Sequence, residues 1–130
     1  MTNEDKLLLL KDISARLPYK VIVERTYIPE NNGYTCELSS YTLDFVTNDK
    51  WDIKPYLRPM SSMTKKERQF LLKFGTVGMD ENDKVFDVYP FGMEKTMPVI
   101  DFLNAHHFDY RGLIEMGLAL EAPDDMYKTK

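Results

Sequence analysis

The residues best suited to chemistry lie close together near the C-terminal end of the chain. His106 and His107 are adjacent, and Asp109 and Arg111 follow shortly after them. Histidine beside a carboxylate is a common combination for general acid–base catalysis, and histidine is also a frequent metal ligand. Neighbouring helical residues point about 100° apart, so two adjacent histidines cannot share one helix face, although one of them could bind a metal ion with residues from elsewhere. The segment is either part of an enzyme site completed from elsewhere or a helix C-terminus capped by histidine.

Other arrangements that would indicate catalysis or metal binding are weak or absent from the sequence. Cys36 and Asp109 could form a nucleophilic set with a histidine, but Cys36 lies within an alternating strand pattern, a poor setting for a reactive thiolate. The acidic run at residues 80–83 lacks the pattern of a calcium-binding loop. Glycine-rich phosphate loops and a nucleophile elbow are also missing. We therefore assign no catalytic residue, no metal ligand and no cofactor.

Two short segments place an aromatic ring beside a guanidinium group: Tyr56 with Arg58, and Tyr110 with Arg111. Such pairs anchor protein–protein contacts, but they also lock loops by stacking within one chain. Both interpretations stay open from the sequence. The candidate binding residues are Lys54, Tyr56, Arg58, His106, His107, Asp109, Tyr110 and Arg111.

Charge is distributed unevenly along the chain. Residues 48–74 contain seven Lys or Arg against three Asp or Glu, whereas the whole chain has a net charge of −4. A basic segment can bind phosphate groups or an acidic partner. The alternative is a solvated helix face, because nucleic-acid-binding domains usually have a larger basic excess overall.

Length and composition are those of an ordinary folded domain. The chain has 130 residues, 43% of them hydrophobic, and a single cysteine, Cys36, which excludes an internal disulfide. The leucine run at residues 7–10 is too short for a signal peptide or a membrane span, and charged residues flank it. We expect a cytoplasmic protein without membrane association.

Hydrophobic periodicity and punctuation residues predict the elements of the N-terminal half. A helix capped by Thr2 or Asn3 should run to Leu17 and bury one face, formed by Leu7, Leu9, Leu10, Ile13 and Leu17. A strand is expected over residues 20–28, followed by a turn at 31–33. Further strands are expected at 34–38 and 41–45, with a short one at 51–53.

Prolines and a capping box organise the remainder. Pro55 and Pro59 predict an extended connector over residues 54–60. Thr64 and Glu67 form a capping box for a helix over residues 65–74, with Gly75 as its C-cap. Three further elements are expected: a strand at 84–91, a helix capped by Thr96 that runs to about residue 106, and a final strand at 117–121.

These elements predict an α+β fold, with about three helices packed on one face of a small, mainly antiparallel sheet. We expect one domain over residues 1–123 and a mobile C-terminal tail over residues 124–130.

Three stretches of the chain resemble a family of small uncharacterised proteins from gut-bacterial genomes and their prophages. They read KPYLRPMSSMT at residues 54–64, FLNAHHFDYRGLI at 102–114 with GLALEAP at 117–123, and SARLPY at 14–19. Residues 75–96 depart from the pattern. The family has no assigned substrate, cofactor or catalytic residue, so the resemblance implies only an intracellular bacterial or phage setting.

Three hypotheses for function follow. The leading one is a small non-enzymatic protein that binds another protein, in a bacterial or prophage context, through the two aromatic–arginine segments. The second is nucleic-acid binding through residues 48–74, and the third is an enzyme with a site around residues 106–111. The sequence does not determine the oligomeric state.

Overall fold

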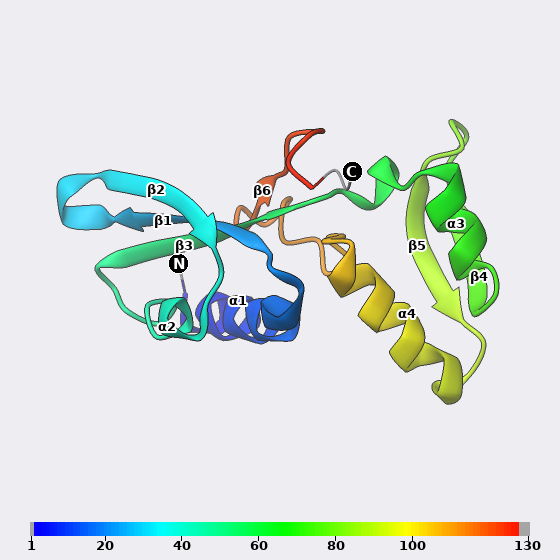
Figure 1. Cartoon of the computed structure of the whole chain (residues 1–130), viewed down its shortest axis with the longest axis horizontal. Coiled ribbons are helices and arrows are strands. Elements are labelled where there is room, and N and C mark those ends of the chain that lie inside the picture. Colours follow the sequence, from blue (N-terminus) through cyan, green and yellow to red (C-terminus); the bar gives the residue numbers. More distant parts are fainter. Residues whose placement is uncertain (1, 128–130) are drawn as a thin grey trace.

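The computed structural model describes residues 2–127. The helices and strands are α1 (Asn3–Arg16), β1 (Ile22–Tyr27), β2 (Asn32–Glu37), α2 (Ser40–Leu43), β3 (Trp51–Leu57), α3 (Lys65–Leu71), β4 (Gly75–Met79), β5 (Val85–Pro90), α4 (Met93–Ala105) and β6 (Leu120–Glu121). They form two lobes, with β1, β2, β3, α1 and α2 at one end and α3, α4, β4 and β5 at the other (Figure 1). The predicted α+β class and its mainly antiparallel sheet are confirmed.

A four-stranded sheet in the order β2-β1-β3-β6 builds the first lobe. The β1–β2 hairpin turns at Asn31, whose left-handed backbone (φ 49°) suits asparagine. β3 pairs antiparallel with β1 on one side and parallel with the short β6 on the other. Helix α1 covers the sheet, and Leu9, Ile13, Val23 and Ile53 form part of the core between them.

The buried stripe of α1 differs from the predicted one. Its buried residues are Leu9, Asp12, Ile13 and Arg16, whereas Leu7, which we expected in the core, is exposed. The positions are three, four and seven apart, as a single helix face requires. Leu9 and Ile13 were predicted correctly, but the prediction counted only apolar residues and did not consider that Asp12 and Arg16 can be buried as a hydrogen-bonded pair.

The second lobe has its own hydrophobic cluster, formed by Met60, Leu71, Val85, Val88, Val99, Leu103 and Phe108. The predicted capping box is present at the start of α3, where Thr64 accepts from the backbone N–H of Glu67 and the Glu67 carboxylate accepts from that of Thr64. β4 and β5 form an antiparallel hairpin that packs against α3 and α4. The two clusters meet at one junction, described below. The single domain expected over residues 1–123 stays a prediction.

Residues 41–45 do not form the predicted strand. The Ser39 side chain accepts a hydrogen bond from the backbone N–H of Thr42, which starts the single helical turn α2. Phe45 follows it and stacks on Trp51, with ring centroids 5.1 Å apart. Apolar and polar residues do alternate in this segment, but the Ser39 cap favours a helical turn over the predicted strand.

Four boundaries also differ from those predicted. The expected connector at residues 54–60 is strand β3 as far as Leu57. Gly75 is not a helix cap but the first residue of β4, where a Cβ atom would lie 2.2 Å from the Tyr89 carbonyl oxygen. Helix α4 begins at Met93 instead of after Thr96, and the Thr96 hydroxyl donates to the Gly92 carbonyl. The final strand spans only Leu120–Glu121.

The C-terminal segment is anchored to the first lobe at Tyr127. The Tyr127 hydroxyl donates to the Tyr56 carbonyl at 2.7 Å and accepts from the Ile22 N–H at 2.8 Å. Burial raises the pKa of Tyr127 to about 12, although the hydrogen bond with Ile22 and the charge of Arg16 act against it. The prediction of a mobile tail did not foresee this anchor, and residues 128–130 of that tail lie outside the described residues.

A fully buried ion pair joins the two lobes. The Arg16 Nε atom donates to Asp12 at 2.9 Å, and Arg16 Nη2 donates to the carbonyl of Phe108 at 2.7 Å. The other Asp12 oxygen accepts from Arg111 Nε at 3.1 Å. Asp12 and Arg16 belong to α1, whereas Phe108 is a fully buried member of the second cluster. The guanidinium therefore ties α1 directly to the backbone that follows α4.

We expect the Asp12→Ala substitution to lower the free energy of unfolding by about 3–5 kcal/mol, because it leaves the Arg16 charge buried without its partner. Urea denaturation of both proteins measures the difference. Lys11→Ala is the matched control, since Lys11 is exposed at the next position of the same helix. A loss below about 1 kcal/mol for Asp12→Ala, the range of a surface pair, would contradict the role assigned to the junction.

Candidate functional site

The two segments that the sequence singled out meet in space. The Arg58 N–H donates to the His107 carbonyl at 2.7 Å, and the Asp109 N–H donates to the Arg58 carbonyl at 2.8 Å. Arg58 thus pairs with Phe108 as an isolated parallel bridge that extends β3. Residues from three distant parts of the chain therefore converge here, because Arg16 binds the carbonyl of the same Phe108.

The Arg58 guanidinium contacts both a carboxylate and an aromatic ring. Its two terminal nitrogens each donate to a Glu67 oxygen at 2.8 Å, and its guanidinium carbon lies 4.2 Å from the centroid of the Phe108 ring. Burial favours a higher pKa for Glu67, but the hydrogen bonds from Arg58 and Thr64 and the Arg58 charge outweigh burial and lower it. Arg58 and Glu67 therefore remain a charged pair that fixes the start of α3 to the end of β3.

Most of the other candidate residues have intramolecular partners. The Tyr56 hydroxyl donates to Glu24 at 2.9 Å, and the Tyr110 hydroxyl donates to Asn104 at 2.9 Å. Lys54 Nζ lies 4.0 Å from Asp52, and Arg111 Nε lies 3.1 Å from Asp12. The Asp109 carboxylate accepts from the Leu113 and Ile114 N–H groups at 2.8 and 2.9 Å. Lys54 and Tyr56 do not line the hollow at the junction described below. Of the two interpretations of the aromatic–arginine pairs, these contacts fit the locking of loops.

The adjacent histidines occupy different environments. The His106 side chain is 44% exposed, stacks on Phe102 with centroids 4.2 Å apart, and places Nδ1 3.3 Å from a Glu67 oxygen. His107 is buried in a left-handed backbone conformation (φ 64°) and stacks on Tyr127 with centroids 3.8 Å apart. The buried Nδ1 atom of His107 has no hydrogen-bond partner among residues 2–127.

Burial is the main reason that the pKa of His107 falls to about 4. The positive charge of Arg16 lowers it further, followed by His106 and Arg58. His107 is therefore neutral at physiological pH, which is compatible with its position close to the charges of Arg16 and Arg58.

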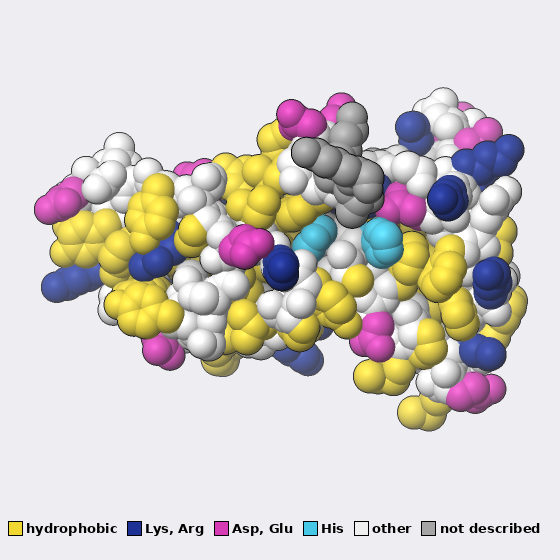
Figure 2. Space-filling model, in the orientation of Figure 1, with side chains coloured by type: hydrophobic (Ala, Val, Ile, Leu, Met, Phe, Trp, Pro, Cys, Tyr) yellow, Lys and Arg dark blue, Asp and Glu magenta, His cyan; other side chains and the backbone are white. Residues whose placement is uncertain are grey.

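A hollow of about 730 Å³ opens beside these residues at the junction of the lobes. The segment before α3, helices α3 and α4, and the segment after β6 line it. Its apolar and aromatic lining residues are Pro59, Phe70, Phe102, Ala105, Ala122, Pro123 and Tyr127, and its polar ones include Arg58, Lys66, Glu67, His106, His107, Glu121 and Asp124. Both histidines lie on the face shown in Figure 2.

Sequence reasoning found only part of this hollow. It identified Arg58, His106 and His107 but missed Phe70 and Phe102 as site residues, since it assigned both rings to buried helix faces. Phe70 is 40% exposed, and its ring stacks on Phe102 with centroids 4.7 Å apart. A signal was present in the spacing, because Phe102 and His106 are four residues apart and so lie on one face of α4.

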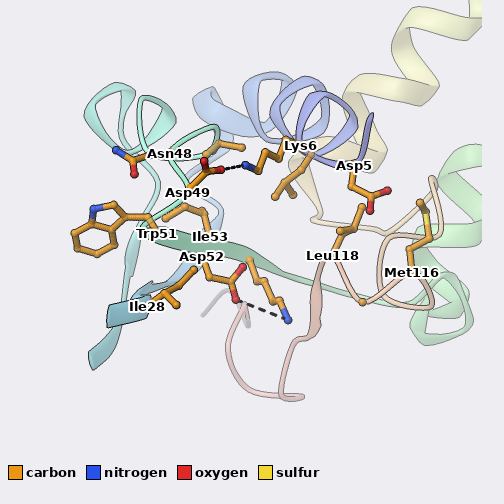
Figure 3. Close-up of a pocket in the computed structure, with 14 residues that line it drawn as sticks. Asp5, Lys6, Ile28, Asn48, Asp49, Trp51, Asp52, Ile53, Met116 and Leu118 are labelled. Atoms are coloured by element: carbon orange, nitrogen blue, oxygen red, sulfur yellow. Dashed lines mark hydrogen bonds and ion pairs between the residues drawn. The ribbon is translucent and has the colours of Figure 1, made fainter. Parts of the chain in front are cut away.

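A second hollow, of about 510 Å³, lies against α1 and β3 in the first lobe. Leu118 and Ile53 contribute to its wall, and the Lys6 side chain points across it to form an ion pair with Asp49 (Figure 3). Lys54 is the only candidate binding residue that lines it. The junction hollow is the stronger candidate site, because three of the eight predicted residues line it, namely Arg58, His106 and His107. Asp109, Tyr110 and Arg111 lie near the junction but do not line the hollow.

Two further findings concern metal binding and membrane-spanning helices. No group of three or more His, Cys, Asp or Glu within residues 2–127 is arranged to hold a metal ion. Among the described helices, none is long and apolar enough to cross a membrane.

We predict that His107 makes the fold sensitive to acid. The unfolded chain takes up a proton near pH 6.5, whereas folded His107 does so only near pH 4. Stability from neutral His107 is therefore present above pH 6.5 and is lost as the pH falls towards 4, by roughly 2 kcal/mol after allowance for solvent screening.

Urea denaturation at pH 7 and pH 4.5 measures this loss. His107→Asn should reduce the pH dependence, because asparagine tolerates a positive φ and does not titrate. His106→Asn, at the adjacent exposed position, is the control and should retain it. Equal pH dependence in wild type and His107→Asn would contradict the prediction.

Comparisons with known proteins place no outside constraint on this site. No protein-family model matches the chain, and searches of curated proteins and of solved structures find no significant match either.

Proposed function

We propose that the protein is a non-enzymatic binding protein whose junction hollow receives an apolar segment of a partner protein. The observation that carries this proposal is the row of aromatic rings along one side of the hollow. Phe70 stacks on Phe102 with ring centroids 4.7 Å apart, and His106 packs against Phe102 in a tilted arrangement with centroids 4.2 Å apart. A partly exposed aromatic surface with a polar rim is the usual anatomy of a protein-binding site.

The rigidity of the hollow supports binding without a large ordering cost. The Arg58–Glu67 pair and the Thr64 cap fix the start of α3, which carries Phe70. The backbone bridge between Arg58 and Phe108 fixes the segment that follows α4. A preformed site loses little conformational entropy when a partner binds.

Catalysis has less support from the same residues. A general base works best when its pKa lies near the operating pH, and the pKa of His107, at about 4, is far below that range. Arg58 and Glu67 neutralise each other in a bidentate pair. His106 is left as the one partly exposed histidine of the hollow, with Glu67 as its neighbour.

Nucleic-acid binding through residues 48–74 also has less support, because the cations of this segment are divided between the lobes. Lys50 and Lys54 lie at and in β3, whereas the α3 group lies at the other end of the molecule and consists of Lys65, Lys66, Arg68 and Lys73 (Figure 1). Arg58 lies between the two groups and is bound to Glu67. Phosphate binding favours a continuous basic stripe, which this arrangement does not provide.

The cellular setting that we propose is the bacterial cytoplasm. The single cysteine and the resemblance to proteins of gut bacteria and their prophages support it.

We predict that Phe70→Ser reduces partner binding by about tenfold or more, because it removes the exposed ring of the aromatic row. Tagged wild-type and variant proteins are incubated at equal concentration in a lysate of the host cell, and the retained proteins are quantified by mass spectrometry. Tyr34→Ser, which removes an exposed ring from β2 in the first lobe, is the matched control.

The two variants are compared only if both unfold cooperatively near the wild-type temperature. A protein that wild type and Tyr34→Ser retain, and Phe70→Ser loses, would support the proposal. Retention of the same proteins in the same amounts by all three would contradict it.

A further inference from the structure

The Tyr127 side chain fills a slot between strands β1 and β3. The antiparallel register of these strands ends at the pair Val23–Pro55. Ile22 and Tyr56 would form the next pair, but the Tyr127 hydroxyl lies between them. It accepts from the Ile22 N–H at 2.8 Å and donates to the Tyr56 carbonyl at 2.7 Å. The hydroxyl therefore takes the place of a backbone hydrogen bond at the point where the two strands separate.

The slot has the shape and the polar groups that suit a phenol. Its side wall is the buried His107 ring, which stacks on Tyr127 with centroids 3.8 Å apart and an angle of 22° between the ring planes. Its floor offers one N–H donor, from Ile22, and one carbonyl acceptor, from Tyr56. A hydroxyl can accept from the first and donate to the second at the same time. A flat ring that carries a hydroxyl satisfies all three walls.

The turn that carries Tyr127 is exposed and has few contacts of its own. Ala122, just before it, is tied to the end of β3 by its N–H at 2.8 Å. Residues 123–125 are exposed, and a hydrogen bond of 3.0 Å from the Met126 N–H to the Pro123 carbonyl closes the turn. Tyr127 is the residue of this turn that packs against the core of the first lobe. Segments with so few buried contacts open locally, at a lower free energy than the core.

The slot adjoins the junction hollow. Pro123, Asp124 and Tyr127 belong to the wall of the hollow, and so does His107 beside Tyr127. When the turn opens, the hollow extends to the floor of the slot. The buried Nδ1 atom of His107 has no hydrogen-bond partner within residues 2–127 while the turn is closed. A ligand that brings a further polar group beside its ring can satisfy this atom, which Tyr127 leaves unpaired.

We propose that the slot is a recognition site for a tyrosine side chain, and that Tyr127 is its built-in occupant, which a tyrosine of the partner segment replaces. This inference rests on the function proposed for the hollow, because it names the chemistry of the segment that enters there. Phenylalanine is a poor substitute, since it leaves the Ile22 N–H and the Tyr56 carbonyl unpaired. Residues 123–127 act as a latch, and the free energy needed to open it lowers the affinity for segments that cannot refill the slot.

Two small probes that differ by one hydroxyl, p-cresol and toluene, test the selectivity of the slot. Tyr127→Ala vacates the slot, and p-cresol should then bind about tenfold more tightly than toluene, because only its hydroxyl pairs with the floor. The NMR signals of the Ile22 amide and the His107 ring report binding. Wild type is the control and should bind p-cresol about tenfold more weakly than the variant, since its slot is filled.

Equal affinity of Tyr127→Ala for the two probes would overturn the proposal. A Tyr127→Ala chain that no longer unfolds cooperatively would also overturn it, because the ring would then be a fixed part of the core and not a replaceable occupant.

Hydrogen exchange measures whether the latch opens separately from the rest of the molecule. After correction for intrinsic rates, the Ile22 amide should exchange at least about tenfold faster than the Arg58 amide, whose hydrogen bond holds the junction. Tyr127→Phe, which keeps the ring, should accelerate exchange at Ile22 by about tenfold. Tyr110→Phe is the matched control, because it removes a hydroxyl that donates to Asn104 outside the slot. Equal exchange rates at Ile22 and Arg58 in wild type would overturn the latch.

Retention from a host lysate separates this inference from the function on which it rests. Tyr127→Ala should retain about tenfold more of the protein that Phe70→Ser loses, and p-cresol, but not toluene, should release that protein. A retained protein that p-cresol does not release would overturn the tyrosine slot and leave the binding function standing. Retention of no protein by either chain would contradict the binding function, and with it the role of the latch.

Discussion

The buried guanidinium of Arg16 is the interaction on which the arrangement of this molecule depends. It satisfies Asp12 within α1 and the Phe108 carbonyl beyond α4, so one side chain belongs to both lobes. A buried charge is tolerated only where it is paired and hydrogen-bonded, which gives this contact a definite geometry. Arg58 completes the clamp from the other side, because its guanidinium lies over the Phe108 ring while its backbone pairs with residues 107 and 109.

The junction hollow is a consequence of this clamp. Its walls belong to α3, α4 and the segment after β6, and the backbone of residues 106–109 holds them in register with β3. Both histidines line the hollow, but His107 is buried, neutral and stacked on Tyr127, whereas His106 is partly exposed. Two neighbours in sequence thus occupy different environments in the wall of one hollow.

The sequence predicted elements whose signals are local. The capping box at Thr64, the Asn31 turn and the strand before Pro90 follow from backbone chemistry within a few residues. The burial of Asp12 and Arg16 could not be predicted in this way, because it depends on a carbonyl 92 residues away in the chain. The hollow was missed in part for the same reason: Phe70 and Phe102 belong to different helices, and only tertiary packing brings their rings together.

The most direct test of the junction is the distance between the lobes in solution. Spin labels at Glu37→Cys in β2 and Lys84→Cys beside β5, in a Cys36→Ser background, place one label on each lobe. Pulsed electron–electron double resonance should give one narrow distribution of distances between the two labels. The Arg16→Met substitution should broaden this distribution while each lobe keeps its secondary structure. A broad distribution with Arg16 intact, or a narrow one that Arg16→Met leaves unchanged, would contradict the claim that this side chain fixes the two lobes.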